Sequence, residues 1–374
     1  MVSPRPAVQA LPTYRPGRNP ADLAREIGVA RAVKLASNEV SFPPLPAVLQ
    51  AVTSTMAESN RYPDNAAVVL TGALAERYGV DPEQVVIGSG AVTLCQQLAQ
   101  SFADPGTSMA FAWRSFEMYP LLAQVAGARD VRVPLVPGRP GGPADTHDLT
   151  ALAAAVDDTT RVVFVCNPNN PTGTAVRGPA LERFLDAVPT STLVVLDEAY
   201  REFVTDPEVP DGVDVMRGRP NVAVLRTFSK AWGLAGLRVG YLLAEDPAVA
   251  EAVRKTNVPF SVSLVAQAAA VAALDSEDEV RARCATVTAE RARLTGELRA
   301  RGLVVEDSQA NFVWLPLGER SAEVAAELEA RAVITRPFPG EGVRVTVGSA
   351  EEDDVFLGAL DDVLSSRDLL PAGA

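Results

Sequence analysis

A lysine among small hydroxyl residues is the group in this sequence best suited to covalent chemistry. Lys230 ends the run TFSK (227–230), which follows the apolar segment 222–225, and Arg238 lies eight residues further on in the run GLRVG. An ε-amino group can attack an aldehyde, while hydroxyls and an arginine can hold a phosphate beside it. Pyridoxal 5′-phosphate (PLP), an aldehyde with a phosphate group, needs both functions, so these residues predict a site for it.

The single histidine limits the alternatives. His147 follows a stretch rich in proline and glycine (134–143), and we expect it to lie in a loop. A Ser-His-Asp triad or a histidine-rich metal site would have to include this one residue, so neither is expected and no metal is predicted. Proton transfer near neutral pH then requires another group, and a lysine with a lowered pKa is the best candidate.

Three further runs each follow a predicted strand, which is where open α/β sheets bind ligands. The run GSGA (88–91) opens a helix whose N–H groups could bind a phosphate. The run NPNNPTG (167–173) is equally consistent with a β-turn and with a ligand-binding loop. Asp197, in the run DEAY (197–200), ends a buried strand. Its carboxylate needs a partner, for which a pyridinium N–H is suitable, or else it caps a helix.

The elements that must position these runs alternate between strands and helices. We predict strands at 85–87, 108–112, 130–133, 161–166, 193–196, 222–226 and 238–244, and helices at 91–103, 116–126, 149–156 and 179–187. This alternation predicts an α/β fold with a mostly parallel sheet.

The pattern changes after Pro247. We predict helices at 262–274, 277–301, 322–331 and 352–364, and strands at 312–315 and 343–347. This is an α+β segment. The predicted domains are therefore an N-terminal arm with part of the small domain (1–33), a large cofactor-binding domain (34–255) and a small C-terminal α+β domain (256–374).

The composition predicts a globular protein of the cytoplasm. Of 374 residues, 47% are hydrophobic and 22% charged, and there is neither a run of 18 apolar residues nor an apolar leader segment. The net charge of −13 disfavours nucleic acid as a partner. The three cysteines are far apart and lack C-x-x-C spacing, so a disulfide framework and a zinc site are not expected.

Taken in order, these runs resemble those of a known family. The sequence is similar to fold-type I, class II PLP-dependent aminotransferases, and within them to the histidinol-phosphate and aromatic amino acid (phenylalanine) enzymes. The resemblance extends from KLASNE (34–39) through NRYPD (60–64) to GVRVTVG (342–348). It implies a mostly parallel seven-stranded sheet flanked by helices, a smaller α+β domain, and a homodimer whose active site is shared across the interface.

The resemblance also implies roles for the residues around the cofactor ring. Lys230 forms the Schiff base, and Asp197 pairs with the pyridine nitrogen and keeps it protonated. Asn170 and Tyr200 donate hydrogen bonds to the ring oxygen. Phe116 stacks on the ring, where the family usually has tyrosine, although a plain core role is the alternative for this residue. Lys230, Asp197 and Tyr200 are the implied catalytic residues.

The remaining implied roles concern the phosphate and the substrate. The implied phosphate ligands are Ala91, Val92, Thr227, Ser229, Arg238 and, from the neighbouring subunit, Tyr62. The run AVT (91–93) replaces an acidic pair that is frequent in the family, but a backbone contact to phosphate should survive this change. Arg344 is implied to bind the substrate carboxylate, unless its side chain faces solvent. Asn38 lies near it, and Tyr14 and Arg336 line the substrate pocket.

The predicted reaction is transamination of an aromatic L-amino acid with 2-oxoglutarate, giving an aromatic 2-oxo acid and L-glutamate. The aromatic substrate is favoured because VPFSVS (258–263) with Ala266 and Gln267 looks like the aromatic version of this segment. The alternative is the histidinol-phosphate aminotransferase of histidine biosynthesis, for which Arg336 and Arg15 could supply charge to a dianion. A PLP-dependent decarboxylase of the same fold, or a PLP-binding regulator, are hypotheses from other classes.

Overall fold

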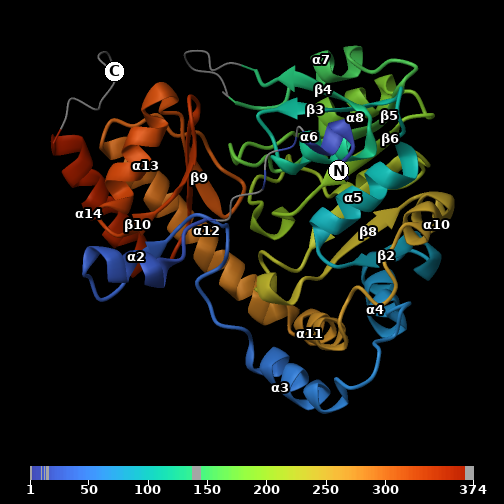
Figure 1. Cartoon of the computed structure of the whole chain (residues 1–374), viewed down its shortest axis with the longest axis horizontal. Helices are drawn as coiled ribbons and strands as arrows, with labels where there is room; N and C mark the ends of the chain where they lie inside the picture. Colours follow the sequence, from blue (N-terminus) through green and yellow to red (C-terminus); the bar gives the residue numbers. More distant parts are fainter. Residues whose placement is uncertain (1, 10, 12, 14–16, 137–144, 367–374) are drawn as a thin grey trace.

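The computed structural model describes residues 2–9, 11, 13, 17–136 and 145–366. A seven-stranded sheet forms the core of its larger part (Figure 1). Its strands are β2 (Val85–Gly88), β3 (Ser108–Trp113), β4 (Arg129–Pro134), β5 (Thr160–Cys166), β6 (Leu193–Asp197), β7 (Val222–Thr227) and β8 (Gly240–Ala244). Their order is β2-β8-β7-β6-β5-β3-β4, and only β8 runs antiparallel to its neighbours. The predicted mostly parallel seven-stranded sheet is confirmed.

Helices cover both faces of this sheet, which explains why its central strands are continuous apolar runs. The helices on one face are α5 (Ala91–Phe102), α6 (Met118–Ala126) and α10 (Pro247–Lys255), and those on the other are α7 (Leu149–Ala154) and α8 (Gly178–Ala187). Phe164 on β5 packs with the first set, whereas its neighbours Val163 and Val165 pack with the second. Successive residues of a strand therefore pack into the apolar layers on opposite faces of the sheet.

A smaller sheet with its own helices follows. It consists of β9 (Phe312–Leu315), β11 (Arg336–Phe338) and β12 (Gly342–Thr346) in the antiparallel order β11-β12-β9. The helices of this part are α12 (Glu277–Ala300), α13 (Ser321–Glu329) and α14 (Ala350–Ser366). The remaining helices are α1 (Pro6–Gln9), α2 (Pro20–Ile27), α3 (Pro46–Thr55), α4 (Val68–Tyr78), α9 (Gly212–Met216) and α11 (Leu264–Asp275).

The N-terminal segment joins this C-terminal part. Strand β1 (Val33–Lys34) pairs in parallel with β10 (Val333–Ile334). Leu23 of α2 shares a small apolar cluster with Ile334, and Figure 1 shows α2 beside α14 and β10. Helix α11, in contrast, packs against α3 and α4. The domain boundaries at 33/34 and 255/256 remain predictions.

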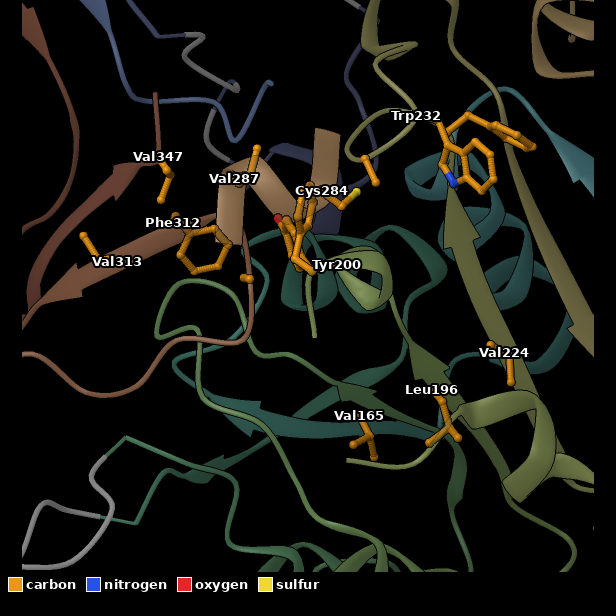
Figure 2. Packing of buried hydrophobic residues seen from close by; sticks show 14 of the residues in the cluster. Val165, Leu196, Tyr200, Val224, Trp232, Cys284, Val287, Phe312, Val313 and Val347 are labelled. Carbon is orange, nitrogen blue, oxygen red and sulfur yellow. The ribbon is translucent and has the colours of Figure 1, made fainter. Parts of the chain in front are cut away.

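One apolar cluster joins the two sheets. Figure 2 shows Tyr200 between Leu196 of the large sheet and Phe312 of the small sheet. The rings of Tyr200 and Phe312 meet edge to face, with centroids 5.1 Å apart. Because Tyr200 follows β6, this contact brings the carboxyl ends of the central parallel strands close to the small sheet, and a cavity lies between them.

A buried ion-pair network fixes the segments that follow β6 and β7. Arg226 donates to Oε2 of Glu198 from Nε and Nη2, at 3.0 and 2.6 Å, and Nη2 also donates to Asp211. Oε1 of Glu198 accepts from the N–H of Gly212 at 2.8 Å. Both Arg226 and Glu198 are buried, so their charges are stable only as long as they remain paired. Glu198 thus has a structural role within the DEAY run.

Several predicted elements begin one or two residues away from their observed starts, and two of them lie next to the site. Strand 238–244 begins at Gly240, because Arg238 has a φ of 57° and lies after a 3₁₀ turn at Ala235–Leu237. Helix 116–126 begins at Met118. Among the described residues, none of the helices has the length and apolar character required to cross a bilayer. The described side chains also include no group of three or more His, Cys, Asp or Glu residues placed to hold a metal ion.

Candidate active site

A cavity of about 800 Å³ lies between the large sheet and the small sheet. It collects most of the predicted site residues from distant parts of the sequence. Those that line it are Asn38, Ala91, Val92, Phe116, Asn170, Asp197, Tyr200, Thr227, Ser229, Lys230, Arg238, Arg336 and Arg344. Tyr62 does not line it and is 80% exposed at the surface. Tyr14 and Arg15 lie outside the described residues.

Lys230 extends into this cavity from the segment after β7. Its Nζ donates a hydrogen bond of 3.0 Å to the carbonyl oxygen of Ser37 and lies 6.0 Å from the centre of the Tyr200 ring. Burial, reinforced by the positive charge of Arg344, lowers the pKa of Lys230 to about 7. A substantial fraction of this amine is therefore neutral at physiological pH, so it can act as a nucleophile or as a base.

Asp197 is the last residue of β6, and only one of its two carboxylate oxygens accepts a hydrogen bond from a described residue. Its Oδ2 accepts a hydrogen bond of 2.6 Å from the hydroxyl of Tyr119. Its Oδ1 is buried and has no hydrogen-bond partner among the described residues. Burial raises the pKa of Asp197 to about 6. A buried carboxylate oxygen at a cavity wall requires a donor, and a pyridinium N–H would satisfy this requirement.

An anion-binding corner forms where the GSGA turn meets Arg238. Gly90 has a φ of 84°, and a Cβ at this position would lie 2.5 Å from Nη2 of Arg238. A Cβ at Gly240 would likewise lie 2.7 Å from the backbone nitrogen of Ala91. Only glycine therefore permits this close approach. The first N–H groups of α5, the Ser229 hydroxyl and the Arg238 guanidinium together suit a phosphate.

The NPNNPTG run combines both roles considered for it. Asn167 accepts from the N–H of Val176, and Asn169 contacts Ser115 and Thr172, so these two side chains hold the loop. Asn170 alone among the three asparagines lines the cavity.

Arg344 lies at the wall of the cavity formed by the small sheet. Its Nη1 donates to Oδ1 of Asn170 and its Nη2 to the carbonyl oxygen of Ala36, both at 2.6 Å. The side chain is 7% exposed, so the solvent-facing alternative is excluded. Asn38, with a φ of 54°, donates to the hydroxyl of Tyr200 at 2.9 Å. These contacts place an arginine, two amides and a phenol around one region of the cavity.

Sequence reasoning missed several residues of this site. Tyr119 was expected only within a helix, but the helical turn places it beside Asp197. Glu117 lines the cavity and pairs with Arg336, with Oε2 and Nη2 2.9 Å apart. Arg18 and Glu329 also line the cavity as an ion pair. Their sequence signal was weak, because ordinary surface charges have the same residue types.

The described residues fit PLP by three independent features. The corner at Gly90 and Arg238 suits its phosphate, the unpartnered Oδ1 of Asp197 suits its ring N–H, and the amine of Lys230 suits its aldehyde. Phe116 lines the cavity as well, with its ring edge-on to Tyr119 at 5.5 Å between centroids. Its aromatic face is thus held in a fixed orientation.

Comparison with known proteins agrees with this geometry. Residues 30–360 match the family "Aminotransferase class I and II". The chain is 55% identical over 353 residues to an aromatic amino acid aminotransferase of Streptomyces avermitilis, covering 94% of this chain and 95% of the relative. It is also 55% identical to that of Thermobifida fusca over 354 residues, with the same coverage.

A solved structure gives the same result at lower identity. The histidinol-phosphate aminotransferase of Sinorhizobium meliloti, in complex with pyridoxal-5′-phosphate, superposes with a TM-score of 0.85 and 30% identity, covering 96% of this chain and 97% of that one. The arrangement of lysine, strand-end aspartate and phosphate corner is thus accompanied by similarity over almost the whole length. The chain belongs to the class I and II aminotransferase family.

Proposed function

We propose that this aminotransferase uses PLP to transfer the amino group of an aromatic L-amino acid to 2-oxoglutarate. The observation that carries the proposal is that Lys230 and the unpartnered Oδ1 of Asp197 line one cavity, with the anion-binding corner at Arg238. A lysine, an acid and a phosphate corner are the three contacts that this cofactor needs. The PLP complex of the Sinorhizobium meliloti relative supports the assignment.

PLP, when bound, supplies an aldehyde that takes up amino groups and a ring that withdraws electrons from the substrate. The protein residues provide the proton transfers and the orientation. Lys230 has a pKa near 7, so its neutral Nζ can remove the α-proton of the substrate. The protonated Nζ can then return a proton to the aldehyde carbon of the cofactor. Asp197, held by Tyr119, keeps the ring nitrogen protonated, and the negative charge of the carboxylate stabilises that proton.

The substrate carboxylate is proposed to bind Arg344. An arginine presents two parallel N–H groups that match a carboxylate, and Arg344 is already oriented by its contacts with Asn170 and Ala36. Asn38 and Tyr200 form one hydrogen-bonded unit at the same place, in which Tyr200 is proposed to donate to the ring oxygen together with Asn170. Burial raises the pKa of Tyr200, so its hydroxyl remains protonated at neutral pH.

The aromatic substrate is supported by the cavity wall and by the relatives. Several apolar side chains line the cavity, namely Phe116, Met118, Leu121, Ile334 and Pro337. Such a wall favours a flat apolar side chain. The relatives with the name "Aromatic amino acid aminotransferase" share 50 to 55% identity with this chain.

We further propose that the protein is a homodimer in which Tyr62 completes the cavity of the neighbouring subunit. The proposed location is the cytoplasm, and the proposed cofactor-binding domain is residues 34–255. Tyr62 is exposed and stacks on Phe260, with ring centroids 4.6 Å apart. Val68, Val69 and Val258 are also exposed, and together they provide apolar surface for an interface. The three cysteines are free and buried, which suits a reducing compartment.

A panel of amino donors on the purified protein tests the proposal. Phenylalanine, tyrosine and tryptophan should give glutamate from 2-oxoglutarate with kcat/KM at least tenfold above that for histidinol phosphate. The product also separates the classes, because a decarboxylase would release carbon dioxide instead of a 2-oxo acid. Absence of 2-oxo acid formation with all aromatic donors would contradict the proposal.

A further inference from the structure

Two arginines face each other at the substrate end of the cavity. Arg336 on β11 and Arg344 on β12 are directly opposed partners in an antiparallel pair, and both line the cavity. Directly opposed residues point to the same face of a sheet with Cβ atoms about 5 Å apart. Two guanidinium groups in this arrangement would hold a doubly charged anion such as a phosphate ester, whose charge is about −1.5 to −2 at neutral pH.

The charge of Arg336 is, however, already neutralised. Its Nη2 lies 2.9 Å from Oε2 of Glu117, which lines the same cavity. Glu117 directly precedes α6, where the N-terminal end of the helix favours a negative charge. Arg344, on the opposed strand, donates to the amide oxygen of Asn170 and to the carbonyl oxygen of Ala36.

The other charged pair of this wall is neutralised as well. Arg18 pairs with Glu329 and with Glu26, and both Arg18 and Glu329 line the cavity. Helix α13, which ends at Glu329, packs against β11. The charges of Arg336 and Arg18 are therefore balanced by carboxylates at this wall, which suits a donor with a single carboxylate better than a phosphate dianion.

We propose that Glu117 determines the substrate class by neutralising Arg336, so that donors with one carboxylate bind and phosphorylated donors are rejected. This inference rests on the proposed function, since it specifies how the same cavity selects its amino donor. Glu117 is a specificity determinant and takes no part in proton transfer. Removal of its charge exposes Arg336 beside Arg344 and creates the site for a phosphate that the unaltered protein lacks.

The test compares Glu117→Gln with the double variant Glu117→Gln/Arg336→Met and with Glu341→Gln as a control. Glu341 pairs with Arg114, and neither lines the cavity, so this control removes one negative charge from an ion pair without exposing Arg336. Each protein, with cofactor, is assayed with phenylalanine and with histidinol phosphate at saturating 2-oxoglutarate. The readout is the ratio of the two kcat/KM values.

Binding of unreactive probes provides a measurement that does not depend on turnover. The probes are 3-phenylpropanoate, with one negative charge, and 3-phenylpropyl phosphate, with two; both lack an amino group. Calorimetric titration should show at least tenfold tighter binding of the phosphate by Glu117→Gln than by the unaltered protein, and less than a threefold change for the carboxylate. The double variant should lose this gain, and the Glu341→Gln protein should not show it.

The outcomes separate this inference from the proposed function. A gain in phosphate binding and in the histidinol-phosphate ratio that requires Arg336 supports the inference. An unchanged ratio and unchanged phosphate affinity in Glu117→Gln overturn it, even if phenylalanine turnover is normal. A gain that persists in the double variant also overturns it. If the unaltered protein turns over no aromatic donor, the proposed function fails, while the probe affinities still decide the role of Glu117.

Discussion

The hydroxyl of Tyr119 donates a 2.6 Å hydrogen bond to Oδ2 of Asp197, and this bond determines which oxygen of the carboxylate faces the cavity. The tyrosine ring is itself fixed, because it stacks on Phe164 with centroids 4.5 Å apart. Asp197 can therefore present Oδ1 to a ring nitrogen without a change of rotamer. The orientation of the acid comes from a helix that the motif around Asp197 does not include.

Replacement of this hydroxyl should weaken the function of the acid. We expect Tyr119→Phe to lower kcat/KM roughly 10- to 100-fold, because a hydrogen bond to a charged group contributes about 1.5–3 kcal/mol. Steady-state kinetics check this, with Tyr241→Phe as the control. That variant also loses a 2.6 Å hydrogen bond, a part-buried one to Tyr78, but does not touch Asp197. Equal kinetics for the two variants would contradict the orienting role.

The amine of Lys230 should be indispensable. Lys230→Ala is expected to lower turnover roughly 10²- to 10⁴-fold or more, because a positioned base usually contributes that much. The protein should still fold. Circular dichroism checks the fold and a glutamate-release assay the activity. Lys255→Ala, at an exposed site, should keep full activity. Borohydride treatment of the unaltered protein should also fix the cofactor to Lys230, and labelling at another lysine would contradict the assignment.

The lowered pKa of Lys230 has a consequence for stability. In the protein freed of cofactor, this pKa is about 7, compared with about 10.4 in the unfolded chain. Between these values the unfolded state binds more protons, so the free energy of unfolding should rise with pH. The contribution of this group approaches about 1.4 kcal/mol per pH unit. The free energy of unfolding, measured by urea titration at each pH from 7 to 10, should rise less steeply with pH for Lys230→Met than for the unaltered protein. An identical rise in both proteins would count against the lowered pKa.

Hybrid dimers can test the shared site. Tyr62→Ala should lower activity, because the neighbouring subunit loses a cofactor contact, and Lys230→Ala should be inactive. When the two variants are unfolded together and refolded at equal amounts, half of the dimers are hybrids with one intact site. Activity should then recover to about a quarter of that of the unaltered protein by random pairing. No recovery would mean that Tyr62 acts within its own subunit or that the chains do not pair.

The buried ion-pair network should dominate local stability. Arg226→Met leaves the carboxylate of Glu198 buried without its counter-charge, which should lower the free energy of unfolding by about 3–5 kcal/mol. Arg219→Met is a matched control, because its partners Glu182 and Asp186 are exposed. This control should lose less than about 1 kcal/mol. Similar losses in both variants, measured by urea unfolding, would show that burial of the pair is unimportant.

The sheet, and the position of Lys230 and Asp197 at its ligand-binding edge, could be predicted because their signals are local. Apolar runs such as 193–197 become central strands, and Lys230 and Asp197 follow such runs at the edge where ligands bind. The aminotransferase family is confirmed by the comparisons. The missed residues depend on contacts that are distant in sequence. Glu117 acquires its role only because β11 brings Arg336 to it, and no residue next to Glu117 reports that contact.

The pairing of β1 with β10 also constrains how the protein is made. Val33 pairs with Val333, so β1 cannot form its hydrogen bonds until about 300 more residues have been synthesised. At typical elongation rates of about 5–20 residues per second, this delay on the ribosome is roughly 15 to 60 seconds. The cavity wall that includes Ala36 and Ile334 therefore forms late in synthesis. A nascent chain can complete much of its large sheet before it has a pocket for substrate.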